Sequence, residues 1–379
     1  MLPAWGRVCL AMFAVGWGAN QFSPMLLVYR DEIGLSGSTR AALFGVYAAG
    51  LIPGLLLGGR ASDRRGRRSL VLPFVALSPL ATLILIVGRH DVALLAAGRL
   101  LAGACSGVVF GTASAWVQDL SGGEPAGVAA RRAAIALSAG FGAGPLVAAL
   151  VAQWAPQPLI VPYLPHLALA LVALALLVPV PEPERVESVG KRPLIVSALR
   201  TSRFRRIALL LAPWVFGFAS ITAIVIPAAV GADSDYALLI AGLANGLTLG
   251  AGAMIQPSIK RLEDRRRMIG AYLGLGLGAG VALGGALAVM AGSTALLLVL
   301  SPVCGIAYGA TLVSGLRETE RLADPAERAA TISVYLAMTY VGFSLPLLIS
   351  WAAPALGTDG ALLVLALLAL TCLGAIARR

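Results

Sequence analysis

The chain has 379 residues, of which 59% are hydrophobic and only 12% are charged, and its mean hydropathy is +0.87. A soluble domain has roughly 45–50% apolar and about 25% charged residues, so this composition excludes an ordinary soluble protein. The formal charge of +11 would indicate a nucleic-acid partner in a soluble chain, but here the basic residues lie in short loops between apolar runs, as in membrane proteins, and we expect no nucleic acid.

Twelve apolar runs follow one another along the chain, each long enough to cross the ~30 Å hydrocarbon core of a bilayer. Their predicted spans are residues 7–29, 39–59, 69–88, 93–118, 132–153, 158–180, 207–230, 237–258, 268–290, 294–314, 330–351 and 361–377. The longest hydrophilic stretch, residues 181–206, is rich in proline and charge, which indicates a linker. We therefore expect an all-α membrane protein with two six-helix bundles, residues 1–180 and 207–379, joined by this cytoplasmic linker.

The basic residues predict that both termini lie in the cytoplasm. With that orientation, all but four of the 29 Lys and Arg residues lie in inner segments, and the exceptions are Arg30, Arg40, Arg89 and, inside the fourth helix, Arg99. No carboxylate lies deep in a predicted helix. The four cysteines and two histidines are scattered, so we expect no metal site and no cofactor. We expect the first apolar run to be retained, as in a multi-pass protein of the cell membrane.

The sharpest motif lies between the second and third predicted helices, in residues 58–68. It resembles the signature G-x-x-x-D-R-x-G-R-R of the major facilitator superfamily. The matching residues are Gly59, Asp63, Arg64, Gly66, Arg67 and Arg68. The resemblance implies a gate on the cytoplasmic side, in which Asp63 faces the start of the eleventh helix and Arg67 pairs with Asp119. The equivalent loop of the second half, residues 260–267, lacks the glycine spacing, so we expect a degenerate copy and an asymmetric gate.

Two further motifs resemble patterns of the same family. Arg99, followed four residues later by glycine, is similar to the family's second motif, and a buried intramembrane charge is functional by default. The alternative is an arginine that extends to the outer interface. Gly140, Gly144 and Pro145 are similar to the motif of the antiporter, or efflux, branch, and the alternative for them is ordinary small-residue packing.

Polar and aromatic residues near helix midpoints are the candidate substrate ligands, because large aromatics beside a few amides suit a mainly apolar pocket. They are Asn20, Gln21, Tyr47, Trp214, Phe218, Asn245, Tyr308 and Tyr340. In the seventh helix, Trp214, Phe218 and Thr222 recur every four residues and share one face. For each residue taken alone, interhelical packing is an equal alternative.

The resemblance implies a secondary transporter, not an enzyme, that moves a small amphipathic or apolar molecule by alternating access. We expect a monomer, although the sequence does not give the oligomeric state. The antiporter-like motif favours efflux in exchange for protons, with Asp119 and Arg99 as coupling residues. Because no deep carboxylate is present, an uptake carrier or an uncoupled facilitator is the alternative. A membrane-embedded enzyme is a remote one, since no catalytic constellation is found. The sequence leaves open the substrate, the direction and the coupling ion.

Overall fold

The computed structural model describes residues 2–122, 124–125, 128–182, 197–230, 234–324 and 327–378. These residues form helices and no strand, so the predicted all-α class is confirmed for this part of the chain. The chain divides into two compact units. Unit 1 contains Met1–Ile33 and Leu43–Arg192, and unit 2 contains Gly34–Ala42 and Pro193–Arg379.

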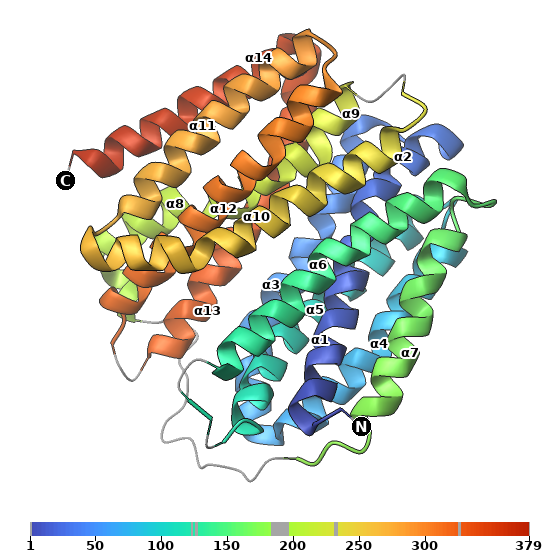
Figure 1. Ribbon diagram of the computed structural model, residues 1–379, viewed down its shortest axis with the longest axis vertical. Helices are drawn as coiled ribbons and strands as arrows, with labels where there is room; N and C mark the ends of the chain where they lie inside the picture. Colours follow the sequence, from blue (N-terminus) through green and yellow to red (C-terminus); the bar gives the residue numbers. More distant parts are fainter. Residues whose placement is uncertain are drawn as a thin grey trace. The chain divides into compact units, whose positions relative to one another are not determined.

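Unit 1 is a bundle in which α1 lies among its neighbours α4, α5, α6 and α7 (Figure 1). Its helices are α1 (Ala4–Asn20), α2 (Phe22–Ile33), most of α3 (Gly37–Arg65), α4 (Arg67–Val87), α5 (Val92–Asp119), α6 (Val128–Trp154) and α7 (Leu164–Leu177), with a 3-10 turn at Val161–Tyr163. Helix α3 packs so closely on α5 that a Cβ at Gly103 would collide with the carbonyl oxygen of Tyr47. Small residues thus let the two backbones touch.

Unit 2 is a second bundle, in which α12 packs against α8, α10 and α11, and α11 also packs against α14. Its helices are α8 (Ser202–Ser220), α9 (Ile226–Val230), α10 (Ala237–Arg265), α11 (Ile269–Met290), α12 (Thr294–Leu322), α13 (Arg328–Thr339) and α14 (Leu345–Ala377). Short helical turns of other types cover Ser197–Arg200, Ile221–Val225 and Tyr340–Ser344. Gly305 of α12 lies against the carbonyl of Thr248 in α10 in the way that Gly103 lies against Tyr47, so the two units use the same packing device.

Nine helical segments of the described chain are long and apolar enough to cross a membrane. The count is below twelve because two helices are too short. Helix α1 has only 17 residues before the helix is interrupted at Gln21, and α7 has only 14 residues. In addition, the last segment, Ala330–Ala377, is counted once although Gly357 adopts a non-helical φ of 73° inside it. Twelve spans therefore remain a prediction.

One predicted boundary is wrong. The linker was expected to reach residue 206, but α8 already begins at Ser202. Thr201 caps this helix by accepting a hydrogen bond from the Phe204 amide at 3.3 Å, so the helix starts among the arginines of the expected linker. Residues 183–196 of that linker lie outside the described residues.

Candidate functional site

The motif loop of unit 1 places Arg67 beside Asp119, as the resemblance implied. Arg67 Nε donates to Asp119 Oδ2 at 3.2 Å, and Arg67 Nη1 donates to Ser62 Oγ at 2.6 Å. The two charged side chains are 20% and 36% exposed, so water reaches the pair. Gly66 supplies a φ of 99°, which side-chain-bearing residues rarely adopt, between α3 and α4. The side chain of Asp63 lies outside the described part of the structure, so its predicted contact stays a prediction.

The first residues of α4 are held by a carboxylate that the motif does not contain. Glu182, which follows α7, accepts hydrogen bonds from the backbone amides of Arg67, Arg68 and Ser69, the last two at 3.2 Å. Arg68 also donates to the carbonyl oxygen of Val178 at 2.9 Å. An acid at a helix N-terminus satisfies free amides and is favoured by the helix dipole. Glu182 therefore ties the end of α7 to the motif loop.

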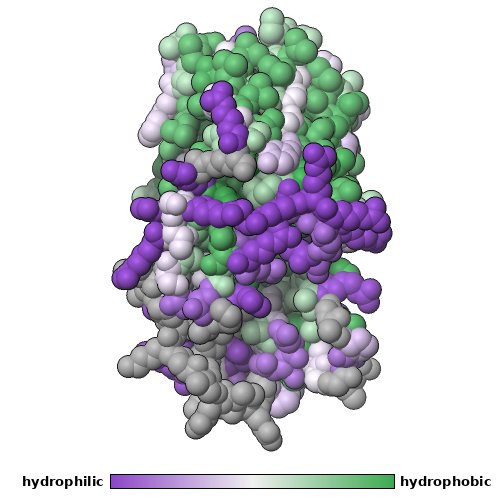
Figure 2. All heavy atoms as spheres, turned by 90° about the vertical axis from the view of Figure 1, so that its left-hand side faces the viewer, coloured by the Kyte–Doolittle hydropathy of each residue, from purple (hydrophilic) through white to green (hydrophobic). Residues whose placement is uncertain are grey.

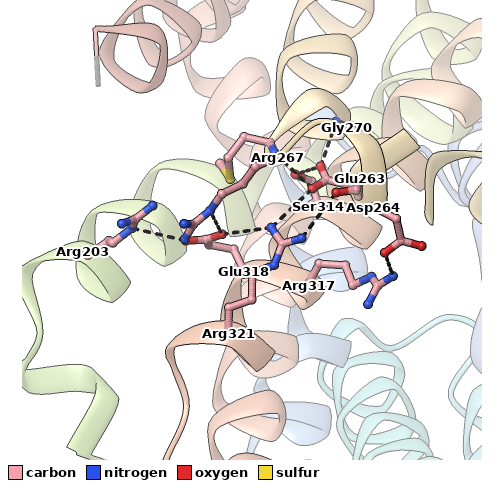
Figure 3. A network of polar contacts seen from close by, with 10 residues as sticks. Arg203, Glu263, Asp264, Arg267, Gly270, Ser314, Arg317, Glu318 and Arg321 are labelled. Atoms are coloured by element: carbon pink, nitrogen blue, oxygen red, sulfur yellow. Dashed lines mark hydrogen bonds and ion pairs between the residues drawn. The ribbon is translucent and has the colours of Figure 1, made fainter. Parts of the chain in front are cut away.

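The corresponding loop of unit 2, which lacks the glycine spacing, also holds the start of a helix through a carboxylate (Figure 3). Glu263 accepts from the amides of Met268 at 3.0 Å and Gly270 at 2.9 Å, and thus holds the start of α11 as Glu182 holds the start of α4. Ser314 Oγ donates to the same carboxylate at 2.6 Å. Met268, with a φ of 62°, lies directly before α11, and Gly66, with a φ of 99°, lies directly before α4. Their ψ angles of 10° and 159° differ, so the two turns are not the same.

The ion pair of unit 1 also has a counterpart in unit 2, with more partners. Arg267 donates to Glu318 through both Nε, at 2.9 Å, and Nη2. Arg203 Nε lies 3.3 Å from the same carboxylate and Arg321 Nη1 lies 3.7 Å from it. Glu318 is 0% exposed, and its hydrogen bond raises the pKa of the Arg267 guanidinium. In Figure 3 these arginines surround Glu318, so the ion network of unit 2 has more partners than the pair of unit 1.

Arg99 lies inside unit 1 and does not extend to an interface. Its side chain is 1% exposed, donates to the carbonyl oxygens of Ala19 at 2.9 Å and Leu43 at 3.3 Å, and lies over the rings of Phe22 and Tyr47. The guanidinium carbon is 4.6 Å and 4.7 Å from the two ring centres, within the range of cation–π attraction. Burial excludes the alternative of an arginine at the outer surface. Its part in coupling stays a prediction.

The glycines of the antiporter-like motif contact α1. A Cβ at Gly140 would collide with the carbonyl oxygen of Phe13, and one at Gly144 would lie too close to the backbone of Trp17. This is the arrangement that the packing alternative expects. An antiporter role for Gly140, Gly144 and Pro145 remains a prediction.

In unit 1, the predicted substrate ligands contact other residues of the bundle. Gln21 donates to Thr82 Oγ1 at 3.1 Å, and the same hydroxyl lies 2.8 Å from Nδ1 of His166, which is 0% exposed. Asn20 donates to the carbonyl of Phe141 at 3.1 Å. Tyr47 lies against Arg99, as described above. A buried polar cluster of Gln21, Thr82 and His166 was not foreseen, since the sequence gave no reason to connect His166 with these residues.

In unit 2, two predicted ligands belong to the hydrophobic core. Phe218 is 0% exposed and its ring occupies the place where Gly278 has no side chain, and Trp214 packs at 5.1 Å from it, centre to centre. Their shared face belongs to the hydrophobic core that α8 forms with α11, so the expectation that it lines a cavity is not supported. Phe216, two residues away, instead stacks on Tyr340 at 4.4 Å and lies 5.6 Å from Tyr308.

Together with Phe343, these three rings form an aromatic cluster in unit 2. It contains two of the predicted ligands, Tyr308 and Tyr340. Asn245 of α10 is 3% exposed, and its Nδ2 has no hydrogen-bond partner among the described residues. A buried amide of this kind costs free energy unless something binds it, so it is the strongest candidate polar ligand in unit 2.

Comparisons with known proteins identify the family of the chain and its fold. The sequence profile described as Major Facilitator Superfamily matches residues 8–316. A mutant of the nucleoside transporter NupG has a TM-score of 0.80 at 13% identity, with 99% of each chain covered. A POT family transporter in complex with a thioalcohol-conjugated peptide has a TM-score of 0.75 at 14% identity, covering 98% of this chain and 95% of that one.

A bacterial homologue of the human lysosomal transporter Spinster, in an inward-facing and unoccupied conformation, has a TM-score of 0.74 at 14% identity, covering 99% of this chain and 96% of that one. A comparison with curated protein sequences finds no match. At these identities the solved structures share the fold alone. The profile covers most of the chain, and the chain therefore belongs to the major facilitator superfamily of membrane transporters.

Proposed function

We propose that the chain is a secondary active transporter of twelve transmembrane helices in two six-helix bundles, and that it works by alternating access as a monomer in the cytoplasmic membrane. The observation that carries this proposal is the repeated ion pair. Arg67 with Asp119 in unit 1 and Arg267 with Glu318 in unit 2 each join the start of one helix to the end of another. Such a repeat is the usual basis of transporters that rock between two states.

The pair in unit 1 suits a gate that must open. Both of its side chains are partly exposed, and an exposed ion pair contributes only about 1 kcal/mol or less. It can therefore break and reform during a transport cycle. The gate would consist of the motif residues Gly59, Asp63, Arg64, Gly66, Arg67 and Arg68 together with Asp119.

The substrate that we propose is a small amphipathic molecule with an aromatic ring. The aromatic cluster of unit 2 offers ring faces at Phe216, Tyr308 and Tyr340, and Asn245 offers an amide nitrogen, Nδ2, that has no partner among the described residues. Aromatic pairs with centres 4.5–7 Å apart contribute about 1 kcal/mol beyond the area they bury, so a ring bound there would be favoured. The solved structures named above are described as transporters of nucleosides or in complex with a peptide, which gives no narrower class.

For coupling, we propose proton antiport in the direction of efflux. Asp119 would carry the proton, because its ion pair with Arg67 must break when the gate opens, so its surroundings would change with the conformation. His166 is a second candidate proton site, because it is a titratable side chain buried in unit 1 and bound to Thr82. An uncoupled facilitator or an uptake carrier is the alternative.

The proposed substrate class is tested by transport of small aromatic amphipathic compounds into proteoliposomes that contain the purified protein. We expect Asn245→Ala and Phe216→Ala to raise the KM of a transported compound at normal protein level. Phe218→Ala is the matched control, because its ring belongs to the core and should change protein stability without changing the choice of compound. Unchanged KM in both test variants would contradict the assignment.

A further inference from the structure

A cavity of about 390 Å³ lies in unit 2 where the start of α8, the start of α11 and the end of α14 meet. Its wall changes character along α8. Arg203 and Arg206 line it in the first turns, and Ile207 and Leu210 line it deeper in the helix. The order is the same at the start of α11, from Arg267, which precedes the helix, to Tyr272 within it. The cavity is thus cationic at one end and apolar at the other.

The cationic end has more positive than negative charge. Arg203 and Arg267 share Glu318, which also faces Arg321, so one carboxylate serves three guanidinium groups (Figure 3). Arg203 uses its Nε for this contact, and its two terminal nitrogens have no hydrogen bond to another described residue. Arg206 is exposed and forms no ion pair with a described carboxylate. Guanidinium groups in such an array match the oxygens of a phosphate.

The position of the cavity favours a ligand that comes from the bilayer. On the face drawn in Figure 2, a band of hydrophilic side chains borders a hydrophobic surface. Leu209 of α8 is 61% exposed and Leu367 of α14 is 63% exposed, as expected for leucines that face lipid. By the predicted orientation, the arginines lie at the cytoplasmic leaflet, where anionic lipids gather and attract basic segments.

We propose that this cavity binds one anionic phospholipid of the cytoplasmic leaflet. Its phosphate lies among Arg203, Arg206 and Arg267, and one acyl chain lies along Ile207, Leu210 and Tyr272. A soluble phosphate would use only the cationic end and leave the apolar wall empty. The bound lipid contacts two arginines that also bind Glu318, so it stabilises the ion network of unit 2. This site is separate from the aromatic cluster and from transport of the substrate.

The test compares lipid binding to purified full-length protein in a neutral detergent, measured by native mass spectrometry and by the rise in thermal midpoint. Phosphatidylglycerol, phosphatidylcholine and inorganic phosphate are titrated separately. Basic side chains near an anionic membrane contribute about fivefold in affinity each. We therefore expect half-saturation by phosphatidylglycerol to rise about fivefold in Arg206→Gln and further in Arg203→Gln/Arg206→Gln.

Arg205→Gln is the matched control, because Arg205 is exposed on the same helix turn and does not line the cavity. It should bind phosphatidylglycerol as the wild type does. If the double variant folds poorly, Arg206→Gln alone decides, since that arginine is outside the Glu318 network. Equal loss in Arg205→Gln, equal binding of phosphatidylcholine, or an equal effect of inorganic phosphate would overturn the proposal.

Discussion

Removing the buried carboxylate of unit 2 should destabilise the protein more than removing its counterpart in unit 1. Glu318 is 0% exposed and faces three arginines, whereas Asp119 is 36% exposed and faces Arg67. Hydrogen bonds to charged groups contribute about 1.5–3 kcal/mol each. The arginines around Glu318 are 35–55% exposed and can turn to water when it is lost, so we discount the sum to about 2–3 kcal/mol.

For Asp119→Asn we expect about 1 kcal/mol or less, the usual contribution of an exposed pair. The assay is the unfolding midpoint of each purified variant in one detergent and at one pH. Glu320→Gln is the control for Glu318→Gln, since Glu320 lies two residues further along α12 and is exposed. If Asp119→Asn lowers the midpoint as much as Glu318→Gln, or if Glu320→Gln does so, the buried network does not stabilise unit 2 as argued.

Three other predictions concern packing, binding and the buried charge. Gly103→Ala should prevent normal folding, as seen by loss of monodisperse protein, because its Cβ meets backbone, whereas Gly246→Ala has open space and should fold normally. Phe218→Ala should lower stability by about 3–5 kcal/mol in a denaturant titration, while Phe216→Ala should change KM more than stability; equal stability losses would argue against the distinction. Arg99→Lys should abolish transport at a normal expression level, because lysine cannot bind two carbonyls and stack on two rings at once, and full activity would refute this.

The fold class was predictable because the lengths of the apolar runs, and the charges of the loops between them, are read directly from the sequence. The motif residues of unit 1 were predicted from their resemblance to the family signature, in which Gly66 takes a positive φ that favours glycine. In unit 2 the residue with positive φ before the helix is Met268, which no signature marks. Glu182 was missed because it lies 114 residues from Arg68, whose amide it binds, and a contact at that separation leaves no periodic signal.

The substrate ligands were the least predictable part. A four-residue repeat places Trp214 and Phe218 on one helix face, but it does not say whether that face meets a neighbouring helix or a cavity. The space at Gly278 decides the question, and this glycine lies 60 residues further along the chain. The runs of glycine in α11 could have suggested that this face packs on a neighbouring helix, because the space beside a glycine can be filled by a large side chain of that helix. His166 was passed over because its partner Thr82 is 84 residues away.

Transport driven by an imposed pH gradient tests the central claim most directly. Proteoliposomes that contain wild-type protein, Asp119→Asn or His166→Asn are loaded with a transported compound, and its movement against its own concentration gradient is recorded. The account predicts uphill movement in the wild type that is lost in Asp119→Asn while downhill flux remains. Loss in His166→Asn alone would assign the proton to the buried cluster of unit 1. Uphill transport that is absent in the wild type at every pH gradient would contradict proton antiport itself.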